Sequence, residues 1–218
     1  GIARCEDWQS VAAALDRDNL AFAPLSAWMP GLQRMIDQRG LGEVLSVSDR
    51  DFREVPGGFD KCASIGVLEH AGRDQLPETI SAMAKVLKPG GLGVLHFIGH
   101  VGQRDTEFYI RKHIFPGGWI PSLSHALSLM EENGLEILDV ENLRPHYART
   151  CAEWLRNFDA VADRVAEMYS EEFVRMWRLY LAGSSAGFES GTLQLFQIVF
   201  TPRGNNDVPW TREYQYPR

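Results

Sequence analysis

The sequence predicts an α/β fold in which a mostly parallel sheet is covered by helices on both faces. Three observations predict it. Apolar runs of strand length alternate with longer segments whose apolar residues recur every three or four positions. Glycine and proline clusters separate the two kinds of segment. Two long helical segments then precede one last apolar run, which indicates a helical insertion before the final strand.

The first quarter of the chain carries short and weakly periodic patterns. Residues 28–38 have helical spacing, with Leu32, Met35 and Ile36 on one face and Gly40 as a plausible stop. The other elements predicted here are a short helix over residues 9–15, a strand over 19–25, a strand over 44–47 and a turn at 56–58.

The patterns are clearer from residue 59 onward. Residues 59–67 are small and apolar with little alternation, which is typical of a buried strand. Residues 74–87 are predicted as a helix that stops at Lys88-Pro89-Gly90-Gly91, because proline and paired glycines cannot continue it. The elements predicted after this stop are a strand over 92–98, a helix over 122–132, a strand over 135–140, helices over 150–169 and 170–184, and a strand over 193–201.

Length and composition bound the class of protein. The 218 residues suit one domain with a full core, over residues 1–203, followed by a polar tail over 204–218. The tail carries Trp210, Tyr214 and Tyr216, so it is either a disordered end or an arm that docks its rings on a partner. The formal net charge of -7 argues against a nucleic-acid partner.

Two further classes of structure are not indicated. No apolar run approaches the roughly 20 residues that a membrane-spanning helix needs. The three cysteines, Cys5, Cys62 and Cys151, are odd in number and widely spaced, which suggests neither a disulfide framework nor a metal site and favours a reducing compartment.

Several motifs occur in a fixed order along the chain. The most informative begins at Phe59 and reads Phe-Asp-Lys-Cys-Ala-Ser-Ile-Gly-Val-Leu-Glu-His-Ala-Gly. The others are Leu87-Lys-Pro-Gly-Gly91, Leu95-His-Phe-Ile-Gly99, the loop from Tyr109 to Ser122, the segment from Tyr169 to Trp177 and the segment from Leu193 to Phe200. Together they resemble the cyclopropane-fatty-acid synthases and mycolic-acid cyclopropane synthases over nearly the whole chain.

The resemblance implies a Rossmann-like fold of the class I S-adenosylmethionine-dependent methyltransferases. It implies transfer of a methylene or methyl group to the double bond of an unsaturated fatty-acyl phospholipid. A carbocation forms in this reaction, so an apolar channel with aromatic faces is expected. Tyr109 and His113 in the family loop are expected either to line the acyl channel or to serve packing alone.

The family uses a bound bicarbonate ion as the base that removes a proton from the cation. The residues that resemble its binding site are Glu69, His96, Tyr147 and the backbone of Ile98. Taken alone, Glu69 could be an ordinary acid at a strand end, His96 a core histidine and Tyr147 a packing residue. A cysteine that the family adds to this site has no counterpart here.

The resemblance also assigns a cofactor site for S-adenosylmethionine. The matching positions are Leu25, Ser26, Asp51, Phe52 and Ile65, although Asp51 could equally cap its own loop. Pro24 and Met29 replace polar residues of the family pattern, and Phe188-Glu189 replaces its Phe-Arg pair.

The family's first strand and glycine-rich loop are not found in the sequence. Gly1-Ile-Ala-Arg4 resembles the family segment on the C-terminal side of that loop, so the start looks processed, truncated or incompletely recorded. The chain as given is therefore expected to bind S-adenosylmethionine weakly or not at all.

The sequence leaves three hypotheses of function open. The first is a lipid-modifying enzyme, cytoplasmic and peripheral to the membrane. The second is a non-catalytic subunit of a larger complex, mitochondrial in one variant, whose protein partner completes the N-terminal side of the sheet. The third is a methyltransferase for a small molecule.

Overall fold

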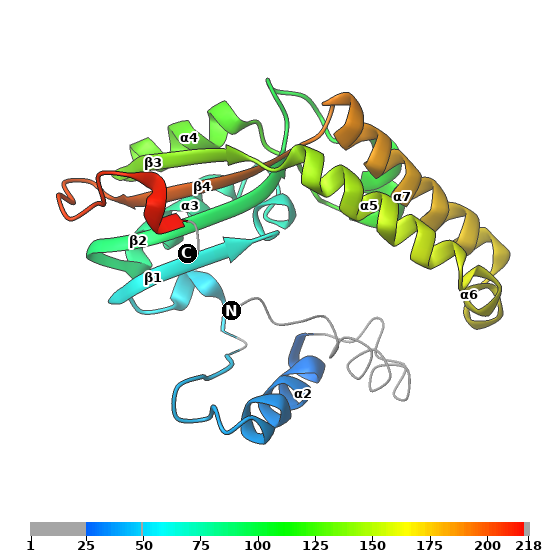
Figure 1. The fold of residues 1–218 in the computed structure, drawn as a ribbon, viewed down its shortest axis with the longest axis horizontal. Coiled ribbons are helices and arrows are strands. Elements are labelled where there is room, and N and C mark those ends of the chain that lie inside the picture. The colour runs from blue at the N-terminus through cyan, green and yellow to red at the C-terminus, as the bar shows by residue number, and fades with distance from the viewer. Residues whose placement is uncertain (1–24, 49, 216–218) are drawn as a thin grey trace. The chain divides into compact units, whose positions relative to one another are not determined.

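A computed structural model describes residues 25–48 and 50–215 of the chain. The chain divides into two compact units, Gly1–Glu54 and Val55–Arg218. Figure 1 labels the helices and strands of both units. The second unit includes the residues after 203, and the division predicted there stays a prediction. The helix predicted over residues 9–15 lies outside the described residues.

The described part of the first unit contains the helix α2 (Leu25–Gln38) and the short 3-10 helix η3 (Phe52–Glu54). The helix predicted over 28–38 is confirmed and begins earlier, so Leu25 starts a helix and does not end a strand. The rest of that predicted strand lies outside the described residues. The strand predicted over 44–47 is wrong. Leu41 accepts hydrogen bonds from the N–H groups of Val44 and Leu45 at 3.0 and 2.9 Å, and these local bonds make turns.

The second unit is built on one mixed sheet of four strands. These are β1 (Phe59–Ile65), β2 (Leu87–Gly99), β3 (Leu135–Asn142) and β4 (Gln194–Pro202), in the order β1-β2-β4-β3. β1 pairs with β2 in parallel, and β4 runs antiparallel to both of its neighbours. Three strands therefore point one way and the last one reverses, as the arrows in Figure 1 show.

The strand β2 is longer than predicted. Phe59 pairs with Leu87 and Lys61 pairs with Leu92, so the register shifts and residues 88–91 bulge between the two pairs. Gly90 adopts a positive φ of 81° in this bulge, a conformation that favours glycine. The proline and glycine cluster ends the helix α3 (Leu76–Val86) as predicted, but it does so by bulging out of a strand rather than by breaking the sheet.

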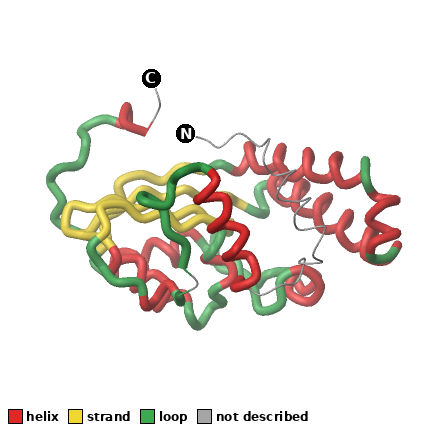
Figure 2. The backbone as a smooth tube through the Cα atoms, turned by 90° about the horizontal axis from the view of Figure 1, so that it is seen from below, coloured by secondary structure: helices red, strands yellow, loops and turns green. Residues whose placement is uncertain are grey.

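Two helices, α3 and α4 (Leu123–Glu132), lie on one face of the sheet, as Figure 2 shows. Every second residue of β2 from Gly91 to Gly99 is buried against them, which is the period of a strand with one covered face. Among the largest fully buried side chains of this core are Leu76, Ile80, Leu95, Phe97, Met130 and Ile198.

The predicted insertion before the last strand is confirmed, with three helices where two were predicted. They are α5 (Arg144–Asp159), α6 (Ala162–Met168) and α7 (Glu171–Ser190). Pro145 stands in the first turn of α5, where a fixed φ suits a helix start. The Ser170 hydroxyl caps α7 by accepting the Phe173 N–H at 3.1 Å, and Gly191 ends that helix with a φ of 81°.

The C-terminal segment lies over the sheet face opposite α3 and α4 in both views (Figures 1 and 2). Asn205 donates to Thr201 Oγ1 at 2.9 Å, and Arg212 forms an ion pair with the buried Asp139 of β3. The Trp210 side chain is fully exposed. Among the described helices, none combines the length and the apolar character that crossing a membrane requires.

Candidate active site

A cavity of about 450 Å³ opens in the second unit where β1 and β2 end. Carboxyl ends of parallel strands are the usual place for a ligand in such a sheet. The sheet contributes Ile65, His96 and Ile98, and Glu69 comes directly after β1 on the 3-10 helix η4 (Leu68–His70). The helical insertion closes the other side. Its contributions to the wall are Tyr147, Cys151, Trp154, Tyr180, Leu181, Ser184 and Phe188.

Glu69 is the central charged group of the cavity. Gly66 adopts a φ of 64° just after β1, and its N–H donates to the His96 carbonyl at 2.9 Å, which turns the chain toward η4. Glu69 Oε1 then accepts the backbone N–H of Ile98 at 2.6 Å. Within the described residues, Glu69 Oε2 is buried without a hydrogen-bond partner.

The environment of Glu69 favours its protonated form. Burial raises the pKa of the carboxyl above its ordinary value, because a charged group is poorly solvated there. The hydrogen bond from Ile98 and the nearby His70 and His96 oppose this shift without cancelling it. The side chain can therefore hold a proton at a pH where an exposed glutamate would have lost it.

His96 stands beside Glu69 on the neighbouring strand. It pairs with Ile65 of β1 and with Gln197 of β4, so the centre of the sheet fixes its backbone. Its Nδ1 is buried and has no hydrogen-bond partner among the described residues. Trp119 Nε1, from the loop that covers the cavity, is also buried without a hydrogen-bond partner among the described residues. Buried polar atoms without a hydrogen-bond partner are rare in folded proteins, and a catalytic role, a water or an ion can account for them.

Tyr147 enters the cavity from the first turn of α5. Its ring meets Phe188 edge-on at a centroid distance of 4.9 Å and Trp154 at 5.7 Å. Burial, with the Cys151 thiol as the next cause, raises the pKa of Tyr147 to about 12. Burial also raises the pKa of Cys151 to about 11. Both groups are therefore neutral near pH 7, and Tyr147 keeps the proton that makes it a donor.

The loop residues Tyr109 and His113 do not line the cavity. The Tyr109 hydroxyl donates to the Met176 carbonyl of α7 at 2.7 Å, and its ring lies 5.2 Å from that of His113. Of the two alternatives, the structure shows packing. The lining residues that sequence reasoning missed include Trp119, Trp154 and Tyr180. Trp154 lies seven positions after Tyr147, which puts both on one helix face and was a usable signal.

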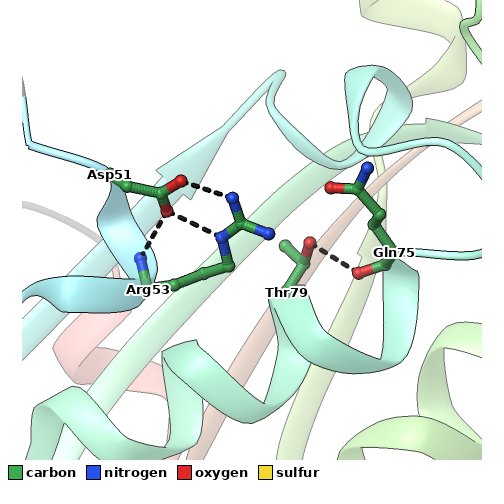
Figure 3. Close-up of polar contacts among 4 residues, drawn as sticks. All are labelled: Asp51, Arg53, Gln75 and Thr79. Carbon is green, nitrogen blue, oxygen red and sulfur yellow. Dashed lines mark hydrogen bonds and ion pairs between the residues drawn. The ribbon is translucent and has the colours of Figure 1, made fainter.

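Four of the five predicted cofactor residues belong to the first unit, and Ile65 alone belongs to the second. Leu25 and Ser26 begin α2. Asp51 caps η3, since its Oδ1 accepts the Arg53 N–H at 3.0 Å, and it forms an ion pair with the Arg53 guanidinium at 2.5 Å (Figure 3). The side-chain and backbone hydrogen bonds from Arg53 lower the pKa of Asp51 to about 2. Ile65 lines the cavity, and the cofactor role of all five stays a prediction.

The arrangement suits one kind of chemistry. Apolar and aromatic walls can keep water away from an apolar ligand and offer ring faces to a cation. A carboxyl with a raised pKa, an imidazole and a phenol line the same cavity, where such groups can hold a small acid or base and move a proton. No cluster of metal-ligating side chains occurs in the part of the chain that the structure describes.

Comparison with known protein families gives one match across most of the chain. The model of the mycolic acid cyclopropane synthetase family matches residues 29–198. That span contains Glu69, His96, Ile98 and Tyr147.

Two curated relatives are similar to this chain in sequence. A probable fatty acid methyltransferase of Pseudomonas putida is 36% identical over 197 residues, which cover 85% of this chain and 50% of that protein. The cyclopropane-fatty-acyl-phospholipid synthase of Escherichia coli is 31% identical over 170 residues, which cover 78% of this chain and 44% of that protein. The chain therefore spans about half the length of the curated relatives that it matches.

Solved structures support the fold. The mycolic acid cyclopropane synthase CmaA1, solved in complex with SAH and CTAB, superimposes with a TM-score of 0.68 at 23% identity. The match covers 79% of this chain and 66% of that chain. The predicted Rossmann-like α/β class is confirmed by this likeness and by the mixed sheet with its helices.

Proposed function

The chain belongs to the mycolic acid cyclopropane synthetase family, and from this premise we propose that its protein transfers a methylene or methyl group from S-adenosylmethionine to the double bond of an unsaturated fatty-acyl phospholipid. The observation that carries the proposal is the apolar cavity in which Glu69, His96 and Tyr147 meet. The names of the relatives support a fatty-acyl substrate.

The walls of the cavity fit the acyl chain. Tyr147, Trp154, Phe188 and Tyr180 contribute ring faces or edges on the side of the insertion, and Trp119 contributes another from the covering loop. An acyl chain gains from contact with this apolar surface, since its methylene groups leave water. The rings also stabilise a positive charge that develops on the chain, which water in the cavity would otherwise trap.

The polar end of the cavity fits a small oxyanion such as bicarbonate. Glu69 Oε2, when protonated, can donate a hydrogen bond, and the Tyr147 hydroxyl is a second donor. His96 Nδ1 is a third polar atom without a protein partner among the described residues. Bicarbonate, when bound, supplies the base of the reaction. Ile98 acts through its N–H, which holds Glu69 Oε1 and leaves only Oε2 for the ion.

S-adenosylmethionine, when bound, supplies the transferred carbon. Of the residues predicted to bind this cofactor, Ile65 at the end of β1 lines the cavity. Leu25, Ser26, Asp51 and Phe52 belong to the other unit, and their role as cofactor residues stays a prediction. SAH in the related CmaA1 structure supports the choice of cofactor.

The proposal is tested with the polypeptide of the complete reading frame. We expect it to transfer label from methyl-labelled S-adenosylmethionine to vesicles of unsaturated phosphatidylethanolamine or phosphatidylglycerol, and the acyl chains to gain the mass of one methylene group. Glu69→Gln is expected to lower the rate roughly a hundredfold. Glu136→Gln, an exposed position on β3, is the matched control and should leave the rate unchanged.

The alternatives give different results in the same assay. A folded protein that labels no unsaturated lipid and binds no S-adenosylmethionine at millimolar concentration would contradict the proposal and favour the non-catalytic subunit. The fully exposed Trp210 is the observation that favours that alternative, since such a ring is a common contact in protein interfaces. Label recovered in a small molecule would favour the third hypothesis.

A further inference from the structure

We propose that the outer face of residues 101–115 binds the surface of a phospholipid bilayer that contains anionic headgroups. The inference rests on the proposed function, because a lipid substrate has to reach the cavity from a membrane. This face would be the surface through which the protein contacts that membrane. The exposure and the charges of a few side chains in this segment support the inference.

The inner face of the segment belongs to the cavity. Thr106 and Ile110 line it, and the buried Thr106 hydroxyl accepts the Ile120 N–H at 2.9 Å. Tyr109 fixes the segment to α7 through its hydrogen bond to Met176. Residues Ile110–Ile114 form one turn of π-helix, a rare conformation that is frequent at functional sites. The segment is therefore a firmly held wall of the candidate site.

The outer face presents apolar side chains to solvent. Phe108 is 68% exposed and Val101 is 69% exposed. Lys112 holds its ammonium 5.4 Å from the centre of the Phe108 ring, and Arg111 is also exposed. The ring of Phe108 and the ammonium of Lys112 therefore lie side by side, and the exposed Arg111 is next to Lys112 in the sequence.

This combination identifies the partner. An exposed ring next to Lys and Arg suits a membrane interface, where a ring can enter the acyl boundary while cations meet phosphate groups. The protein as a whole carries a formal net charge of -7, whereas the three cations Arg104, Arg111 and Lys112 outnumber the carboxylates within residues 101–115. The same segment carries Asp105 and Glu107, and Glu107 lines the cavity.

The position of this face suits delivery of a substrate. Phe108, which is exposed, and Ile110, which lines the cavity, are two residues apart in the same short helical segment. A lipid held at the outer face therefore has its acyl chain next to the cavity. A protein partner on the same face is the competing outcome, and it predicts no affinity for protein-free vesicles.

The test is sedimentation of the protein with vesicles of phosphatidylcholine alone and with added phosphatidylglycerol. We expect stronger binding to the anionic vesicles, and weaker binding as salt rises. The double variant Arg111→Glu and Lys112→Glu should weaken binding to the anionic vesicles by about tenfold or more. Phe108→Ser should weaken binding to both kinds of vesicle by roughly tenfold, whereas Phe108→Leu should retain most of it.

Two matched controls separate this face from general effects. Leu179→Ser removes another exposed apolar side chain, 58% exposed on α7, and Lys85→Glu reverses a charge on α3. Neither control should change the binding. Circular dichroism melts check that each variant is folded. Equal binding by the wild type, the variants of residues 108, 111 and 112 and the controls, or no binding to either vesicle, would overturn the inference.

The outcome is separable from the proposed function, because binding is measured without S-adenosylmethionine. A protein that binds vesicles through this face but transfers no methyl group would contradict the proposed function alone. A protein that labels lipid and binds vesicles as before when Phe108, Arg111 and Lys112 are changed would contradict the membrane-binding face alone.

Discussion

The two oxygens of Glu69 have different surroundings, and this decides what the residue can do. Oε1 is held by the Ile98 N–H, and Oε2 is buried without a partner in the described part of the chain. Burial raises the pKa, so the folded protein holds the proton more tightly than the unfolded chain does. This proton contributes its full stabilisation of the fold below pH 4.5, the ordinary pKa of a glutamate. The stabilisation is lost as the pH rises through the higher pKa that Glu69 has in the folded protein.

Glu69→Gln removes this pH dependence. Glutamine keeps an oxygen for the Ile98 N–H and carries no charge. We expect the variant to gain about 1 kcal/mol in free energy of unfolding near pH 8 over the wild type, and to gain nothing near pH 4. Urea unfolding at the two pH values measures it, with Glu136→Gln as control. An equal change at both pH values would contradict the explanation.

Tyr147→Phe separates the hydroxyl from the ring. The ring contacts with Phe188 and Trp154 remain, so the free energy of unfolding should change by less than about 0.5 kcal/mol. The lost donor should lower kcat roughly a hundredfold with little change in KM, if the hydroxyl acts on the reacting groups.

Tyr109→Phe is the matched control for this prediction. It removes the same atom from a tyrosine outside the cavity lining and breaks a hydrogen bond to Met176. It should cost about 1 kcal/mol in free energy of unfolding and lower kcat far less than Tyr147→Phe does. A kcat equal to the wild type in Tyr147→Phe would assign Tyr147 to packing alone. Steady-state kinetics on lipid vesicles and urea unfolding give the two readouts.

Single residues of this site were poorly predictable without a family. Taken alone, His96 in an apolar strand reads as a core residue, and Glu69 reads as a strand-end acid. The resemblance placed both on known positions, and the structure brings them to one cavity. Trp119 was missed because it reaches the cavity from an irregular loop, where no period links it to the strands.

At the scale of elements, the strands β2 and β4 depend on one small residue. Gly93 pairs directly with Phe200, and a Cβ at Gly93 would lie 2.2 Å from the ring of Phe200. Gly93→Ala should therefore lower the free energy of unfolding by about 2–3 kcal/mol, since both strands are fixed by their neighbours. Gly93→Ala combined with Phe200→Leu should recover part of this loss.

The contrasting control for Gly93 is Gly183 in α7, where an added Cβ would meet nothing within 4 Å. Gly183→Ala should raise the free energy of unfolding by about 0.5–1 kcal/mol, because alanine is the better helix former. Thermal and urea unfolding of the three variants measure both effects. A Gly93→Ala variant as stable as the wild type would mean that the two strands move apart at little cost.

The periodicity of apolar residues predicted the helices and the strand that pack in the core. It failed where local hydrogen bonds determine the backbone conformation. The helices on its covered face and the last strand were predicted within a few residues. The apolar run at Val44 and Leu45 predicted a strand. In the structure the N–H groups of both residues bond to the Leu41 carbonyl, and these local bonds form turns instead. The break between α5 and α6 was missed because residues 160 and 161 carry no glycine or proline to signal it.

At the scale of the whole molecule, the sequence predicted an α/β sheet with an insertion but left the C-terminal segment with two alternatives. The structure shows that segment against its own sheet, through Asn205 and through Arg212. Neither contact was predictable, because the sequence of a segment without periodicity does not indicate which side chains of the sheet it will contact. Asp139 is buried on β3, only 8% exposed, and a buried carboxylate needs a partner of this kind.

Arg212→Ala should therefore destabilise the whole second unit. It leaves the Asp139 carboxylate in a poorly solvated place, and the expected loss in free energy of unfolding is about 1–3 kcal/mol. Asp139→Asn added to Arg212→Ala should restore part of it, since the stranded charge is gone. Truncation after Arg203 removes the Asn205 bond as well and should cost more than Arg212→Ala alone. Urea unfolding of the single, double and truncated proteins measures these differences. A truncated protein as stable as the full chain would show that the segment contributes nothing to the stability of the sheet.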